Sequence, residues 1–138
     1  HMDISMENFV INDVLVEEIQ SDDDAKHASQ GETVKFVLEE IQIKLVDFGL
    51  AERFADDQCL CDKWCGKTKY KSPEVVAEKT AFHAKMNDVW CLGVCLFMMS
   101  TGSSPWNKAS ECDDYYRLVR GGNMKRMLQA WNLQKFVD

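Results

Sequence analysis

The chain lacks the sequence features that are typical of membrane-spanning and of nucleic-acid-binding proteins. Its longest apolar run, Val89 to Met99, is too short to span a bilayer, and no signal-like segment opens the sequence. Positive charge is scarce, because 16 Lys and Arg face 23 Asp and Glu, for a net charge of −7. Nucleic acids and anionic membranes are bound mainly through basic faces, so we expect neither as a partner. A cytoplasmic location, or a nuclear one, is the expectation.

The sequence also lacks a complete ligand set around its cysteines. Cys59, Cys61 and Cys65 have a spacing that suits a metal, but no fourth ligand of matching type lies nearby. Without a secretory signal, six cysteines favour free thiols in a reducing compartment over disulfides. We therefore expect free thiols and rank a zinc site below them.

The composition is that of one globular domain. A chain of 138 residues with 46% hydrophobic and 28% charged residues can bury its own core. The charge is uneven, since residues 12–40 hold nine acidic side chains against two lysines, which accounts for the whole net charge. The remainder is neutral, and no internal repeat or domain boundary is visible.

Two stretches read as strands. Phe9–Ile11 and Ile41–Val46 are rich in β-branched residues, and the flanking Val14–Ile19 and Thr33–Leu38 continue the pattern. We predict an elongated hairpin. Its tip, Ser21–Gly31, is polar and is predicted to be mobile, because it cannot recover the entropy of ordering.

The second half of the chain predicts helices. Met86–Thr101 is apolar nearly all round, which indicates a helix buried on most faces and ended by Gly102. Glu111–Arg120 is amphipathic, and Met124–Trp131 is a last helical stretch. The predicted fold class is mainly α with a short β-hairpin.

Four ordered motifs carry chemistry. Asp47-Phe48-Gly49 follows an apolar strand, Ser72-Pro73-Glu74 and Asp88–Gly93 lie downstream, and Asp3–Asn8 opens the chain. Together they resemble the larger, C-terminal lobe of eukaryotic protein kinases, in incomplete form. The resemblance implies that residues 1–138 are a partial protein kinase domain, from the catalytic loop to about helix G or H.

The resemblance assigns the reacting groups. Asp3 would orient the substrate hydroxyl and take its proton, as the catalytic aspartate does. Asn8 and Asp47 would bind the Mg²⁺ that bridges the phosphates of ATP, and hard oxygen ligands suit that ion. Phe48 would pack beneath Asp47 and set its position, and Gly49 completes the turn. Asp3, Asn8 and Asp47 are thus the predicted catalytic residues.

Two positions depart from the family's pattern. Met2 stands in place of the usual Arg, and Ser5 in place of the Lys that steadies the transferring phosphate in Ser/Thr kinases. A serine hydroxyl can donate only a neutral hydrogen bond. We therefore expect a rate penalty unless another cation substitutes.

A substrate-docking loop is predicted next. Gly66, Lys67, Thr68 and Tyr70 match it, although the family usually has Gly-Thr where this chain has Gly66-Lys67. Tyr70 favours Ser/Thr specificity. Four lysines gather in the segment, and they either attract acidic substrates or are solvated without preference. They are Lys63, Lys67, Lys69 and Lys71.

Two further residues receive structural roles from the resemblance. Glu74 is normally paired with an Arg further along, which this chain lacks. A buried carboxylate is costly without a partner, so Glu74 is expected to be unpaired, paired locally, or satisfied by another chain. Asp88 is expected to tie a buried helix to the backbone of the catalytic loop.

An insertion separates the first two motifs. Asn8 and Asp47 are 39 positions apart, and the family usually needs about a third of that. Residues 12–40 are therefore interpreted as an acidic insertion in the hairpin before Asp-Phe-Gly. It is either an inert loop or a docking element.

The resemblance also implies missing parts. No Gly-rich loop and no strand lysine in a Val-Ala-Ile-Lys context are present, so the small lobe of the kinase is a missing partner. We predict that the full-length parent transfers phosphate from ATP to Ser or Thr of a protein substrate. This fragment alone is predicted to be inactive, and its exposed lobe surface favours a homodimer. The alternative is a pseudokinase or scaffold that binds proteins through the acidic hairpin or the Lys-rich docking loop.

Overall fold

The computed structural model describes residues 1–19, 35–55 and 57–133. The chain forms two compact units, a helical unit of His1–Asn8 with Asp47–Asp138 and a hairpin unit of Phe9–Val46. The predicted mobile tip, Ser21–Gly31, lies outside the described residues.

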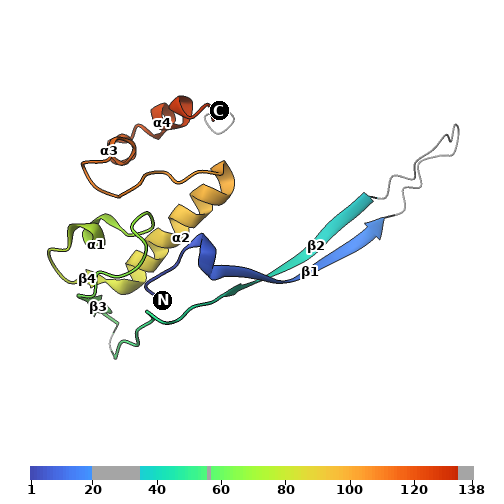
Figure 1. Cartoon of the computed structure of the whole chain (residues 1–138), viewed down its shortest axis with the longest axis horizontal. Helices are drawn as coiled ribbons and strands as arrows, with labels where there is room; N and C mark the ends of the chain where they lie inside the picture. Colours follow the sequence, from blue (N-terminus) through green and yellow to red (C-terminus); the bar gives the residue numbers. More distant parts are fainter. Residues whose placement is uncertain (20–34, 56, 134–138) are drawn as a thin grey trace, which may run out of the picture. The chain divides into compact units, whose positions relative to one another are not determined.

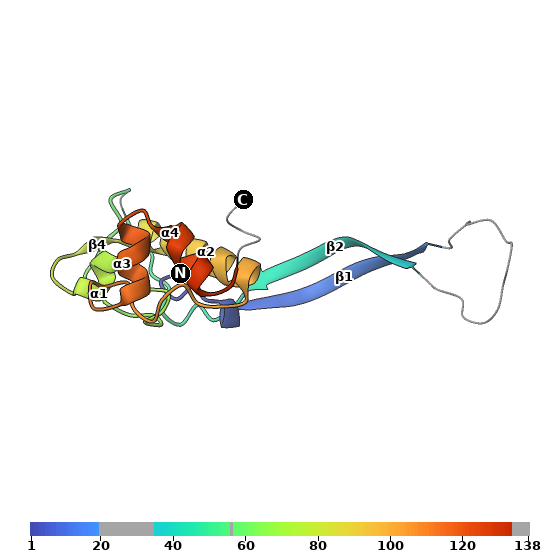
Figure 2. The same cartoon turned by 90° about the horizontal axis from the view of Figure 1, so that it is seen from above.

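The hairpin unit consists of two long antiparallel strands, β1 (Phe9–Ile19) and β2 (Lys35–Leu45), drawn as the paired arrows of Figures 1 and 2. The register pairs Phe9 with Leu45 and Ile11 with Ile43, and it shifts after Ile11 and again after Leu15. Such shifts are bulges, which increase the local twist of a strand pair. The predicted elongated hairpin is confirmed.

The helical unit holds the remaining elements, which Figure 1 labels. After a 3-10 turn over Met6–Asn8 come β3 (Leu60–Cys61), α1 (Pro73–Ala77), β4 (Phe82–His83), α2 (Ala84–Thr101), α3 (Asp114–Arg120) and α4 (Met124–Ala130). The elements α1, β3 and β4 were not predicted, because two- and five-residue elements are too short for a periodic pattern. β3 and β4 exist through their mutual pairing, Leu60 with His83 and Cys61 with Phe82.

The long helix α2 has clear ends. His83 Nδ1 accepts the backbone N–H of Met86 at its start, and Gly102, with φ +77°, donates its N–H to Met98 O at its end. The predicted helix and its glycine stop are confirmed.

The burial predicted for α2 is wrong in part, because only one face is covered. Its buried residues are Ala84, Asn87, Cys91, Val94 and Cys95. An apolar stripe at helical spacing is instead between 45% and 62% exposed: Met86, Val89, Leu92, Leu96 and Met99. No element of the described chain buries this stripe.

The predicted helix Glu111–Arg120 begins three residues later than expected, because Asp113 is its N-cap. The carboxylate of Asp113 accepts the backbone N–H groups of Tyr115 and Tyr116 through Oδ1, and those of Asn107 and Lys108 through Oδ2. The N-cap residue has an extended, non-helical backbone, so the helix cannot start before Asp113.

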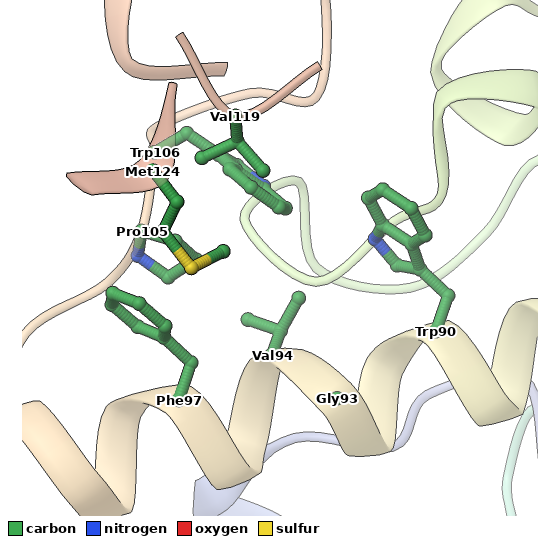
Figure 3. A pocket seen from close by; sticks show the side chains of 8 residues that line it. All are labelled: Trp90, Gly93, Val94, Phe97, Pro105, Trp106, Val119 and Met124. Atoms are coloured by element: carbon green, nitrogen blue, oxygen red, sulfur yellow. The ribbon is translucent and has the colours of Figure 1, made fainter. Parts of the chain in front are cut away.

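Aromatic residues join α3 and α4 to α2. Trp90, Val94 and Phe97 of α2 face Trp106 and Met124 across an apolar cavity of about 250 Å³, as Figure 3 shows. The Trp106 ring stacks edge-on to Tyr116 of α3 at a centroid distance of 5.4 Å. A second small core, Met2, Cys61, Val75, Phe82 and Ala84, joins the chain start to the β3–β4 pair. Among the described helices, none has the length and apolarity needed to cross a bilayer.

We expect Asp113→Ala to lower the free energy of unfolding by about 1–2 kcal/mol, because it removes a helix cap. Urea unfolding followed by circular dichroism measures the change. The matched control is Asp114→Ala, since Asp114 forms only an exposed pair with Arg117 among the contacts described and should cost less than about 0.5 kcal/mol. Equal losses in the two variants would contradict the assignment of Asp113 as the cap.

Candidate active site

The first eight residues are fastened to α2 by Asp88. Its carboxylate accepts the amino group of His1 through Oδ2 at 2.7 Å and the backbone N–H of Met2 through Oδ1 at 2.9 Å. Asp88 therefore joins the helix to the backbone of the segment that contains Asp3, which is the contact that its expected structural role requires.

The Asp3 carboxylate is held from two directions. Asn8 donates its side-chain N–H to Asp3 Oδ2 at 3.3 Å and to the Asp3 carbonyl at 2.7 Å. The backbone N–H of Lys67 donates to Asp3 Oδ1 at 3.2 Å. Each carboxylate oxygen has two acceptor positions, so Asp3 can still accept a further proton donor.

Gly66 allows this approach. Its φ is +86°, and a Cβ at this position would lie 2.8 Å from the Met2 carbonyl oxygen. Only glycine combines this backbone conformation with such a close contact. Gly66 therefore sets the position of the neighbouring Lys67.

Lys67 also reaches the same segment with its side chain. Its Nζ donates to Ser5 Oγ at 2.7 Å and to Glu7 Oε2 at 3.3 Å. Ser5 is completely buried, whereas the side chain of Lys67 is 41% exposed. The pKa of the Glu7 carboxyl is lowered, mainly by its own backbone N–H and further by Ser5 and Lys67, which outweigh partial burial.

Tyr70 belongs to the framework of the site. Tyr70 is 4% exposed, and its hydroxyl donates to Glu7 Oε2 at 3.2 Å. The Tyr70 hydroxyl oxygen accepts a hydrogen bond from the Met6 N–H at 3.3 Å. Burial, with Glu7 nearby, raises the pKa of Tyr70. The predicted substrate contact of the Tyr70 side chain is therefore replaced by a packing role, because the ring is covered. Thr68, two positions earlier, is exposed.

Asp47, Phe48 and Gly49 form a tight turn. Asp47 has φ +59°, and its Oδ1 accepts the N–H of Gly49 at 3.3 Å. Phe48 is 63% exposed, with its ring edge-on to His1 at 4.8 Å. The expectation that Phe48 packs beneath Asp47 is therefore wrong for the described chain, because no apolar pocket encloses the ring.

The oxygen donors of Asn8 and Asp47 fit a hard cation such as Mg²⁺. Both hydrogen bonds of the Asn8 amide nitrogen go to Asp3, which fixes the amide orientation and leaves Asn8 Oδ1 as an acceptor. Asp47 is exposed and presents a carboxylate. Carbonyl and carboxylate oxygens are the ligands that Mg²⁺ prefers.

The other predicted residues have simpler surroundings. Glu74 is exposed and so carries no cost of a buried charge. Three of the four lysines make contacts: Lys67 as described, Lys63 with Glu52, and Lys71 with the Trp64 carbonyl. Lys69 is exposed.

The thiols of Cys61, Cys65, Cys91, Cys95 and Cys112 are free. Within the described ranges, no group of three or more His, Cys, Asp or Glu side chains is placed to hold a metal ion.

Sequence reasoning missed three residues of the site's framework. Glu7 gathers Lys67 and Tyr70, and Cys91 donates its thiol hydrogen to the Tyr70 carbonyl at 3.2 Å. Asn87 Oδ1 accepts the N–H of the buried Ser72 at 3.1 Å. Asn87 and Cys91 interrupt the apolar run of the predicted helix, and this was the one signal in the sequence for polar contacts on that helix.

Comparisons with known proteins found a family model and several relatives. The family model described as "Protein kinase domain" matches residues 1–136. The chain is 37% identical over 79 residues to Serine/threonine-protein kinase KIN4 of Saccharomyces cerevisiae, covering 55% of this chain and 10% of that protein. It is 38% identical over 76 residues to Serine/threonine-protein kinase grp of Drosophila melanogaster, covering 53% and 14%.

Protein kinase 3 of Dictyostelium discoideum is 34% identical over 109 residues, covering 72% of this chain and 12% of that protein. The chain thus spans only about a tenth to a seventh of the length of these relatives.

We expect Gly66→Ala to lower the free energy of unfolding by about 1–3 kcal/mol, because the new Cβ meets the Met2 carbonyl in a strained conformation. Gly93→Ala is the control, since nothing lies within 4 Å of a Cβ there and the residue is helical. It should leave stability unchanged or raise it by up to about 1 kcal/mol. Urea titration of both variants checks the difference, and a stable Gly66→Ala protein would refute the close approach.

Cys91 should resist alkylation. Burial, reinforced by the charge of Asp88, raises the pKa of its thiol to about 12, so at pH 8 only about one thiol in 10,000 is ionised. The exposed Cys112 should react with iodoacetamide in the folded protein, and Cys91 only after unfolding in urea. Mass spectrometry of peptides gives both rates. Comparable rates in the folded protein would contradict the burial of Cys91.

Proposed function

The chain belongs to the protein kinase domain family, and from that premise we propose that it is part of an ATP-dependent Ser/Thr protein kinase. The chain supplies the C-terminal, large-lobe portion of the catalytic domain. Its parent transfers a phosphoryl group to a protein substrate. Two of the relatives bear the name serine/threonine-protein kinase, which supports the choice of acceptor.

One observation carries the proposal: the opening segment that contains Asp3 is held by two residues distant in sequence, Lys67 and Asp88. The Asn8 amide and the Lys67 N–H both donate to the Asp3 carboxylate, and Asp88 fixes the backbone just before it. A carboxylate fixed by donors on two sides is oriented in advance. A phosphoryl-transfer site accelerates its reaction mainly by orienting the reacting groups and by stabilising negative charge.

The residues then divide the chemistry. Asp3 orients the attacking hydroxyl and accepts its proton as the new oxygen–phosphorus bond forms and ADP leaves. Asn8 Oδ1 and the Asp47 carboxylate would hold Mg²⁺. When bound, Mg²⁺ supplies positive charge to the phosphates of ATP. Gly49 keeps the Asp47 carboxylate in place through its N–H.

The large-lobe assignment includes an insertion. Asn8 and Asp47 belong to the same unit, while residues 9–46 between them form a unit of their own. This division supports the interpretation of residues 12–40 as an acidic insertion that leaves the site intact.

Exposed apolar side chains support a missing partner. The α2 stripe of Met86, Val89, Leu92, Leu96 and Met99 and the ring of Phe48 are uncovered in the described chain. Apolar patches of this kind are usually covered by protein. We assign the cover to further parts of the kinase, the small lobe among them, and expect no turnover from residues 1–138 alone. Without those parts, homodimers are the expected way to bury the stripe.

A scaffold function is the second candidate, and one observation favours it. Ile11 and Ile43 face each other in the hairpin, and they are 66% and 59% exposed. An exposed apolar pair is a suitable contact for a protein partner. This function requires no phosphoryl transfer.

The deciding experiment measures incorporation of labelled phosphate into a Ser/Thr peptide library by the longest native polypeptide that contains this chain. Asp47→Asn should reduce the rate about a thousandfold or more, because it weakens the site for the metal. Asp62→Asn, the same change at an exposed position of the same segment, should retain full activity.

Two results would contradict the kinase proposal. One is an active Asp47→Asn protein. The other is a folded wild-type protein with neither phosphate transfer nor magnesium-dependent ATP binding, which would favour the scaffold.

A further inference from the structure

A cation from another segment reaches the loop that holds Asp3. The Lys67 backbone N–H binds Asp3 Oδ1 at 3.2 Å, and its ammonium binds Ser5 Oγ at 2.7 Å. Both polar ends of one residue therefore contact positions 3 and 5 of the same short segment. The ammonium therefore contacts a residue two positions after Asp3, whose carboxylate the proposed reaction uses.

The contact joins two of the positions at which the chain departs from the kinase pattern, Ser5 and Lys67. The family has a lysine where this chain has Ser5, and a threonine where it has Lys67. Here the hydroxyl stands on the first segment and the ammonium on the second, and the two touch. The pair of groups is retained with its members exchanged.

The surroundings hold Lys67 in place without neutralising it fully. Gly66 fixes the backbone before it, and Glu7 lies 3.3 Å from its ammonium. Glu7 is 61% exposed, and an ion pair in contact with water is weak. Glu7 is itself engaged by the Tyr70 hydroxyl. The ammonium can therefore bind a more highly charged group that enters the site.

We propose that Lys67 is a catalytic residue that donates hydrogen bonds from its ammonium to the transferring phosphoryl group, in place of the lysine that Ser5 replaces. Lys67 supplies fixed positive charge where the negative charge of the phosphoryl oxygens is held during transfer. It exchanges no proton. The inference rests on the proposed kinase function and adds the residue that makes the reaction efficient without a lysine at position 5.

The test uses the longest native polypeptide that contains the chain, with Mg·ATP and a Ser/Thr peptide. Lys67→Gln keeps a side chain that can bind Ser5 but removes the charge, and it should lower kcat about 100-fold or more while KM for the peptide changes less than threefold. Lys79→Gln, an exposed lysine after α1, is the control and should match the wild type.

The exchange can also be reversed. Lys67→Thr should be as slow as Lys67→Gln, and the double variant Ser5→Lys/Lys67→Thr should recover at least tenfold in kcat. Thermal unfolding of every variant within about 3 °C of the wild type separates this charge effect from loss of structure. Recovery by the double variant is the result expected only if the charge, and not the residue at one position, serves the reaction.

The outcomes separate the two claims. An active wild type with kcat unchanged in Lys67→Gln overturns the role of Lys67 and leaves the kinase function standing. A wild type without transfer contradicts the kinase function, and the affinity ratio of Mg·ATP to Mg·ADP then decides on Lys67. A lower ratio in Lys67→Gln supports its contact with the terminal phosphate, and an unchanged ratio overturns it.

Discussion

The contact between the backbone at Gly66 and the segment Met2–Asp3 is the constraint on which the candidate site depends. A hydrogen atom in place of a side chain lets the two backbones approach, with φ at +86° and the Met2 carbonyl 2.8 Å from the place of a Cβ. This approach puts the Lys67 N–H on Asp3 and the Lys67 ammonium on Ser5. Asp88 holds the same segment from the side of α2. The geometry around Asp3 thus follows from one glycine and one half-buried carboxylate.

Long elements and motifs could be predicted from the sequence, and short or tertiary features could not. The β-branched content of its strands predicts the hairpin, and a long apolar run predicts α2. The β3–β4 pair and α1 are too short for a period, and they form only because distant residues such as Leu60 and His83 meet. The start of α3 depends on which acid caps it, and the sequence offers Glu111, Asp113 and Asp114 within four positions.

The motif residues illustrate the same limit. The order of the motifs predicts that Asp3, Asn8 and Asp47 act together, because that order resembles a known family's, and the structure shows the contact between Asn8 and Asp3. The order could not indicate that Tyr70 is buried against Glu7, since that depends on the packing of the segment after Gly66. The exposure of Phe48 and of one α2 face was likewise beyond prediction, because apolar residues predict burial without saying which polypeptide provides the cover.

The candidate site differs from the kinase pattern in having a hydroxyl at position 5 and an ammonium at position 67. A loss of the lysine at position 5, taken alone, argues for a weakened enzyme. The 2.7 Å contact between the two positions bears on that conclusion, because it brings an ammonium group against position 5 from another segment.

The most direct measurement is a crystal structure of the longest native polypeptide with Mg²⁺ and a non-hydrolysable ATP analogue. We expect Asn8 Oδ1 and the Asp47 carboxylate among the metal ligands, with the Lys67 ammonium about 3 Å from an oxygen of the terminal phosphate. A nucleotide bound elsewhere, or a terminal phosphate out of reach of both Asp3 and Lys67, would contradict the assignment of this site to phosphoryl transfer.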